Sequence, residues 1–169
     1  MRKGYSVLIK SFAIISAKYP DWQIVFIGNG EVEQGKALAK QLGIEDHVVF
    51  LGWVSGAAKD KAFQEASIFC LPSYAEGFPM SVLDAWAYGL PVITTPVGGL
   101  KDVLVHGENA MLFQPGNINS LSKYMEELVS NECLRENLSR ASVKLSQGPF
   151  NIKTISQQLN NIYLNLNSE

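Results

Sequence analysis

Glu76 and Asp84 are the two side chains of this sequence whose type and spacing are best suited to chemistry. Pro79 stands between them, at a position from which proline typically opens a helix. Such a helix exposes the backbone N–H groups of Met80 and Ser81, which together with the helix dipole attract an anion such as a phosphate. Asp84 shares a face with Ser81 one turn later, where a carboxylate can accept hydrogen bonds from both hydroxyls of a ribose. Glu76 precedes the helix, within reach of a second hydroxylated group.

The same residues allow a simpler interpretation. Glu76 is then a solvated loop residue, and Asp84 only complements the positive end of the helix. The residue types favour neither interpretation, so both stay open. Lys3 could pair with a phosphate, but its spacing alone favours a solvated lysine near the start of the chain. Gly98-Gly99 either turns its N–H groups toward an anion or is only a turn.

Strands and helices alternate along the chain, which predicts an α/β fold with a parallel sheet and helices on both faces. Apolar runs predict strands at 22–27, 47–51, 67–71, 90–94 and 110–113. Helical spacing, with glycines and prolines between the runs, predicts helices at 7–15, 31–42, 59–66, 79–88, 100–105, 117–129, 132–145 and 152–166, with Asn117 or Asn119 as the cap of the sixth. The first strand is apolar nearly throughout, as expected of a strand covered on both faces.

In such sheets a ligand binds beyond the carboxyl ends of the strands. Four loops follow strand ends here, at 28–30, 52–56, 72–79 and 95–99. All four are rich in glycine, proline or small residues, which let a backbone approach a ligand closely. The sequence therefore predicts a ligand site along this edge.

Bulk properties exclude several classes of protein. The 169 residues suit one domain with a full core, and the net charge of −2 gives no basis for a nucleic-acid partner. Cys70 and Cys133 lie far apart in different contexts, which gives no metal-binding spacing and makes a disulfide a poor expectation, so a reducing cytoplasm is the expected location. No signal peptide and no apolar run long enough for a membrane span are visible.

A series of short segments occurs in one collinear order: Lys3-Gly4, Ile27-Gly28-Asn29-Gly30, Val49 to Val54, Leu71 to Pro79, Gly89 to Ile93 and Val97-Gly98-Gly99. In this order they resemble the C-terminal half of a family 4 glycosyltransferase (glycosyl transferases group 1), and the match runs through nearly the whole chain. The resemblance implies one Rossmann-like domain, residues 1–169 with 150–166 as the terminal helix, which is half of a two-domain GT-B architecture. It also implies that the first strand and the N-terminal acceptor domain are absent.

The resemblance assigns roles to individual residues. Glu76 matches the first acid of the family's Glu-x7-Glu motif and is the implied catalytic residue, in contact with the transferred sugar. Asp84 matches the second acid, which holds the ribose and is usually Glu. Lys3 matches a lysine that contacts the donor diphosphate. The full set of implied donor-binding residues is Lys3, Gly28, Gly30, Gly52, Trp53, Val54, Glu76, Gly77, Phe78, Pro79, Met80, Ser81, Asp84, Gly98 and Gly99.

The implied reaction is retaining transfer of a sugar from a nucleotide-diphosphate sugar, a UDP- or GDP-sugar, to a glycan, lipid-linked or small-molecule acceptor. No metal and no cofactor are expected, and the isolated chain is expected to be inactive because the acceptor domain is missing. Two alternatives stay open: a non-catalytic nucleotide-binding module of the same fold, and a sugar-nucleotide epimerase. We expect a cytoplasmic location, with peripheral association of the parent protein at the cytoplasmic face of the membrane as a further alternative.

Overall fold

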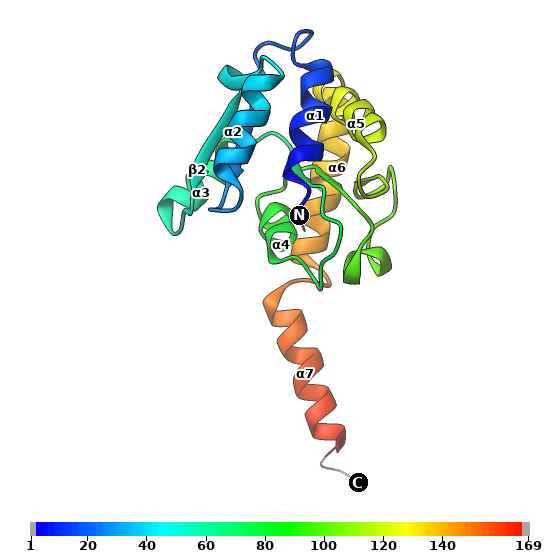
Figure 1. The fold of residues 1–169 in the computed structure, drawn as a ribbon. Helices are drawn as coiled ribbons and strands as arrows, with labels where there is room; N and C mark the ends of the chain where they lie inside the picture. The colour runs from blue at the N-terminus through cyan, green and yellow to red at the C-terminus, as the bar shows by residue number, and fades with distance from the viewer. Residues whose placement is uncertain (1–2, 167–169) are drawn as a thin grey trace.

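The computed structural model describes residues 3–166, which form a layered α/β domain (Figure 1). The elements are α1 (Tyr5–Ile15), β1 (Ile24–Ile27), α2 (Val32–Gln41), η1 (Glu45–His47), β2 (Val48–Gly52), α3 (Ala57–Glu65), β3 (Phe69–Leu71), α4 (Met80–Ala87), β4 (Val92–Thr94), η2 (Gly98–Asp102), β5 (Met111–Leu112), α5 (Ile118–Ser130), α6 (Glu132–Gln147) and α7 (Ile152–Leu166). The alternation of strands and helices that the sequence predicts is confirmed.

All strand pairs are parallel, but the strands form two sheets rather than one. β1 pairs with β2, and β4 pairs with β3 on one side and β5 on the other. One of the two hydrophobic cores nevertheless spans both sheets, because it contains Ile24 and Val48 from the first and Ile93 and Met111 from the second. Apolar runs predict which segments are strands, whereas the hydrogen-bonding partner of each strand depends on tertiary packing.

Helices cover both faces of the central strand β4. Val92 and Ile93 are both fully buried, although neighbouring side chains of a strand point to opposite faces. Ile93 belongs to the core formed with α1, α2 and α5, while Val92 packs in a second core with α3 and α4. The predicted arrangement, with helices on both faces, is therefore confirmed.

The first strand does not follow the prediction that both of its faces are covered. Ile24 is buried and Phe26 stacks on Phe50 with ring centroids 4.9 Å apart, on the face that α2 covers. Val25 and Ile27, on the other face, are each 43% exposed. Apolar composition thus overstated the burial of this strand, because the face that carries Val25 and Ile27 is left partly uncovered.

Several element ends differ from the predictions. Pro79 is the N-cap of α4 rather than its first helical residue. Asn117, not Asn119, caps α5, since its Oδ1 accepts a hydrogen bond of 2.9 Å from the N–H of Ser120. The segment expected to be a short helix at 100–105 is the 3₁₀ helix η2, which begins earlier, at Gly98.

The terminal helix α7 extends away from the rest of the molecule (Figure 1). It spans Ile152–Leu166, as the helical spacing predicts, and so lacks the first two residues of the 150–166 segment that the resemblance implies. Ile152, Leu159 and Ile162 are exposed along it. Within residues 3–166, no helix combines the length and apolar character that a membrane span requires.

The two cysteines should differ in reactivity. Cys133 is exposed, whereas Cys70 is half-buried and the loss of hydration there raises the pKa of its thiol, which disfavours the reactive thiolate at pH 8. We expect the native chain to react rapidly with one equivalent of a thiol reagent at pH 8, and with a second only after denaturation. The variant Cys133→Ser should lose the rapid phase. Two rapid equivalents in the native protein would contradict this assignment.

Candidate functional site

The Glu76 carboxylate is nearly buried, with 6% of its side chain exposed, in the loop between β3 and α4. Its Oε1 accepts a hydrogen bond from Lys3 Nζ at 2.6 Å and another from Ser73 Oγ at 2.6 Å. A carboxylate is stable at such depth only when it is paired and hydrogen-bonded. Glu76 is therefore not the solvated loop residue of the simpler interpretation.

Lys3 holds this carboxylate while remaining open to solvent. Its side chain is 59% exposed, so donors of the ammonium group beyond the one used by Glu76 can reach a ligand. The interpretation of Lys3 as a merely solvated lysine misses this contact. Residues 73 positions apart in the chain thus form one ion pair at the carboxyl end of β3.

The loop after β4 fixes the loop that carries Glu76. The buried Thr95 hydroxyl donates to the Ser73 carbonyl at 2.6 Å, and the Gly99 N–H donates to the Gly77 carbonyl at 2.8 Å. A Cβ on Gly98 would lie 2.2 Å from the Gly77 oxygen and 2.3 Å from the Glu76 oxygen. Gly98 and Gly99 therefore support the Glu76 loop directly, and the N–H of Gly99 is already engaged there.

Asp84 lies in the second turn of α4 and forms an ion pair that the sequence did not reveal. Its Oδ2 is 2.7 Å from Lys59 Nζ on α3, and the two side chains are 33% and 36% exposed. Because α4 begins at Met80, Asp84 also lies beyond the first turn, where a carboxylate complements the helix dipole. The simpler interpretation of Asp84 is therefore weakened.

A second contact joins α3 to α4 beside this pair. The Tyr88 hydroxyl donates to Asp60 Oδ1 at 2.5 Å. This hydrogen bond raises the pKa of Tyr88, with desolvation and the negative charges of Asp60 and Asp84 as further causes. The two helices are thus held together next to Asp84.

The loops after β1 and β2 form a second group of the predicted residues. The N–H of Gly28 donates to the carbonyl of Gly52 at 2.7 Å, and the N–H of Trp53 donates to Asn29 Oδ1 at 2.7 Å. The Trp53 side chain is 76% exposed beside this link. Gly30 and Val54 lie in the same two loops. α3, which carries Lys59, follows directly from the second loop.

Sequence reasoning missed four residues of this region: Asn29, Lys59, Ser73 and Thr95. Ser73 stands three residues before Glu76, a spacing that is typical of local serine hydrogen bonds. Lys59 gave no local signal, because its partner lies on another helix. Among residues 3–166, no group of three or more His, Cys, Asp and Glu side chains could hold a metal ion.

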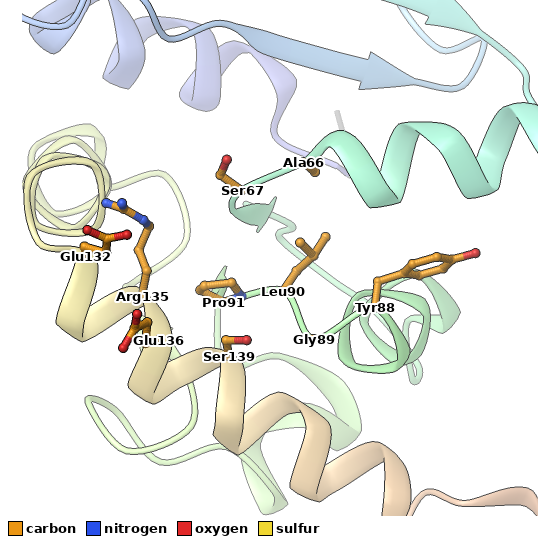
Figure 2. Close-up of a pocket in the computed structure, with 10 residues that line it drawn as sticks. All are labelled: Ala66, Ser67, Tyr88, Gly89, Leu90, Pro91, Glu132, Arg135, Glu136 and Ser139. Carbon is orange, nitrogen blue, oxygen red and sulfur yellow. The ribbon is translucent and has the colours of Figure 1, made fainter.

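The pocket in Figure 2 lies at the opposite edge, where residues 66–67 precede β3 and residues 89–91 precede β4. Its volume is about 350 Å³. Arg135 at its rim donates to the carbonyls of Leu128 and Val129 at 2.6 and 2.9 Å, which ties α6 to the end of α5. None of the donor-binding residues that the resemblance implies lines it.

A sequence model of the family described as glycosyl transferases group 1 matches residues 1–145. The chain belongs to this family. An uncharacterised glycosyltransferase of Haemophilus influenzae is 36% identical over 147 residues, which cover 86% of this chain and 41% of the relative. A phosphatidyl-myo-inositol mannosyltransferase of Mycobacterium leprae is 29% identical over 163 residues, covering 96% and 43%. The chain thus spans less than half the length of these curated relatives.

Solved structures agree with this membership. The C-terminal domain of a glycosyl transferase group 1 family protein from Francisella tularensis has a TM-score of 0.79 and 26% identity, over 89% of this chain and 81% of that one. The Anabaena protein HepE in complex with UDP has a TM-score of 0.87 and 23% identity, over 96% of this chain and 45% of that one. The fold is therefore that of a GT-B glycosyltransferase domain, as expected.

Gly98→Ala should destabilise the chain strongly. Its φ of +59° strains any other residue, and the new Cβ would collide with two backbone oxygens that cannot move independently. We expect a loss of about 2–4 kcal/mol in the free energy of unfolding, measured by urea denaturation. Gly30→Ala is the matched control, because a Cβ there meets nothing within 4 Å. Equal losses for both variants would contradict the supporting role of Gly98.

Proposed function

We propose that this chain is the donor-binding half of a retaining glycosyltransferase, which moves a sugar from a nucleotide-diphosphate sugar to a glycan, lipid-linked or small-molecule acceptor. One observation carries the proposal: a nearly buried carboxylate, Glu76, is held by Lys3 and Ser73 just before the N-terminus of α4. Acidic and cationic groups thus stand side by side at the edge where parallel sheets bind ligands.

Each part of this arrangement suits one part of such a donor. The exposed ammonium of Lys3 and the N–H groups of Met80 and Ser81 favour the diphosphate. Glu76 accepts hydrogen bonds from sugar hydroxyls, and Asp84 accepts them from the ribose. As the sugar–phosphate bond breaks, negative charge grows on the diphosphate leaving group, and Lys3 and the helix N-terminus stabilise it.

The first donors to test are uridine and guanosine diphosphate sugars. The HepE structures of the same fold contain UDP or UDP-glucose. The relative from Mycobacterium leprae is named as a mannosyltransferase. We propose that the acceptor binds mainly through a further domain, since the curated relatives are more than twice as long as the matched segment, and that residues 1–169 alone transfer no sugar.

We also propose that the parent protein works in the cytoplasm, where the unpaired cysteines Cys70 and Cys133 remain reduced. A lipid-linked acceptor would bring it to the cytoplasmic face of the membrane.

Glu76→Gln should weaken binding of a sugar nucleotide more than binding of the nucleotide alone. The amide keeps the size of the side chain but carries no charge, so it can neither form the ion pair with Lys3 nor accept charge-assisted hydrogen bonds from sugar hydroxyls. We expect about a tenfold loss of affinity for UDP-glucose or GDP-mannose, or about 1.4 kcal/mol, and a smaller loss for UDP or GDP. Calorimetry measures both affinities, and thermal shift gives a second readout.

Glu33→Gln is the control for this variant, because Glu33 is exposed on α2 and its one ion pair among the described residues is an i,i+3 pair with Lys36. A Glu76→Gln protein that binds sugar nucleotides as tightly as the wild type would contradict the role of Glu76. A wild-type chain that binds neither nucleotides nor sugar nucleotides would overturn the proposed function.

Donor binding should not depend on a divalent metal ion, since we propose that Lys3 and the α4 N-terminus meet the diphosphate charge. Treatment with EDTA is expected to leave the donor-induced rise in melting temperature unchanged. A rise that disappears with EDTA and returns with Mg²⁺ or Mn²⁺ would overturn the metal-free proposal.

A further inference from the structure

We propose that Lys59 is a positioning residue for donor recognition, which fixes the Asp84 carboxylate so that its second oxygen receives the ribose hydroxyls. This inference rests on the proposed function and adds a residue from α3 to the site. Its basis is the ion pair of 2.7 Å between Lys59 Nζ and Asp84 Oδ2.

The pair leaves one carboxylate oxygen available. Lys59 engages Oδ2, and within residues 3–166 no hydrogen bond occupies Oδ1 of Asp84. Both side chains remain about one third exposed, so a ligand can reach the carboxylate without breaking the pair. A carboxylate with one oxygen held in place is oriented before the ligand arrives, which lowers the entropy lost on binding.

The α3 side of the pair is itself held in place. Lys59 Nζ lies 5.7 Å from the centroid of the Phe63 ring, and Phe63 is buried in the second core. The neighbouring Asp60 accepts the hydrogen bond from Tyr88, which caps the C-terminal end of α4 one turn beyond Asp84. Two polar contacts, in addition to packing, therefore fix α3 against α4 at this point.

The length of the acid makes such a partner useful. Asp carries its carboxylate on a single methylene group, so the charge of Asp84 stays close to the α4 backbone. The long side chain of Lys59 reaches it there from α3. Lys59 also lies in the first turn of α3, which follows the 52–56 loop, so a short segment connects the implied donor-binding residues Trp53 and Val54 to the partner of Asp84.

Charge balance supports the same conclusion. Lys3 pairs with Glu76 and Lys59 pairs with Asp84, so each proposed donor-binding acid carries its own counter-charge. Without Lys59, the unpaired Asp84 carboxylate would repel the diphosphate of the donor. Lys59 thus allows an acidic group to recognise hydroxyls within an anionic ligand.

The test measures how much more tightly the chain binds a nucleotide with ribose than one whose ribose lacks the 2′ and 3′ hydroxyls. Calorimetry compares UDP with 2′,3′-dideoxy-UDP, and GDP with its dideoxy counterpart, for the wild type, Lys59→Met, Asp84→Asn and the double variant. We expect the wild type to prefer the ribonucleotide and Lys59→Met to lower that preference threefold to tenfold. Asp84→Asn should remove most of the preference, and adding Lys59→Met to it should cause little further loss.

Lys61→Met is the matched control, because Lys61 lies on the same helix in an i,i+4 pair with Glu65 at 3.7 Å, where both side chains are largely exposed. It should leave the preference unchanged. Lys59→Arg, which retains a cation, should restore most of the preference. Melting temperatures of the unliganded variants separate any loss of folding from loss of recognition, since methionine retains the apolar contact with Phe63.

Two results overturn the positioning role while the proposed function stands. One is a Lys59→Met protein with an unchanged preference. The other is an equal loss of affinity for the ribo and dideoxy nucleotides, which would mean that Lys59 acts only through its charge. A wild-type chain that binds none of the four nucleotides overturns the proposed function and this inference together.

Discussion

The ion pair between Glu76 and Lys3 is the interaction on which the arrangement of the candidate site depends. Removing a carboxylate from water costs of the order of several kcal/mol unless partners replace the lost hydration. Ser73 supplies one partner from the end of β3, and Lys3 supplies the other just before α1. The start of the first helix is therefore fixed against the end of a strand from the middle of the chain. A Cβ on Gly4 would lie 2.0 Å from the Pro72 oxygen, so the close approach also requires glycine there.

The ion pair between Lys59 and Asp84 also gives a carboxylate a cationic partner, with a smaller desolvation penalty than at Glu76. Lys59 and Asp84 are both partly exposed, so their desolvation penalty is small and their mutual stabilisation is modest. What the pair provides is orientation and local neutrality next to the N-terminus of α4. A diphosphate that approaches this edge meets two acids that are already paired, one largely exposed ammonium group and a positive helix end. Both acids can then serve as acceptors for hydroxyls without a net negative field around them.

The sequence predicted the strands, the helices and the position of the Glu76 loop because these depend on local signals. Apolar runs between glycines and prolines fix where β3 and β4 lie, and Asn117 shows a typical capping position. The partners of the two acids could not be predicted. Lys59 meets Asp84 only because α3 packs beside α4, and no residue pattern within either helix encodes that contact. The exposure of Val25 has the same origin, since it depends on which helices cover β1 and not on the strand itself.

The glycines that mark the resemblance to the family divide into two kinds, and this changes what they say about the site. Gly4, Gly28, Gly52 and Gly98 all have positive φ values, and of these Gly28 and Gly52 shape two loops that hydrogen-bond to each other. Gly4 and Gly98 instead allow backbone segments to touch, one against Pro72 and the other against the Glu76 loop. Glycines of the second kind are required by the packing beneath the acid rather than by the ligand. The glycines Gly4 and Gly98 are therefore evidence that the Glu76 loop is packed correctly, and they are weaker evidence for a direct contact with the donor. Recognition of the hydroxyls of a donor must come from side chains that glycine cannot supply, and the pairing of Asp84 with a lysine from α3 is such a feature of this chain.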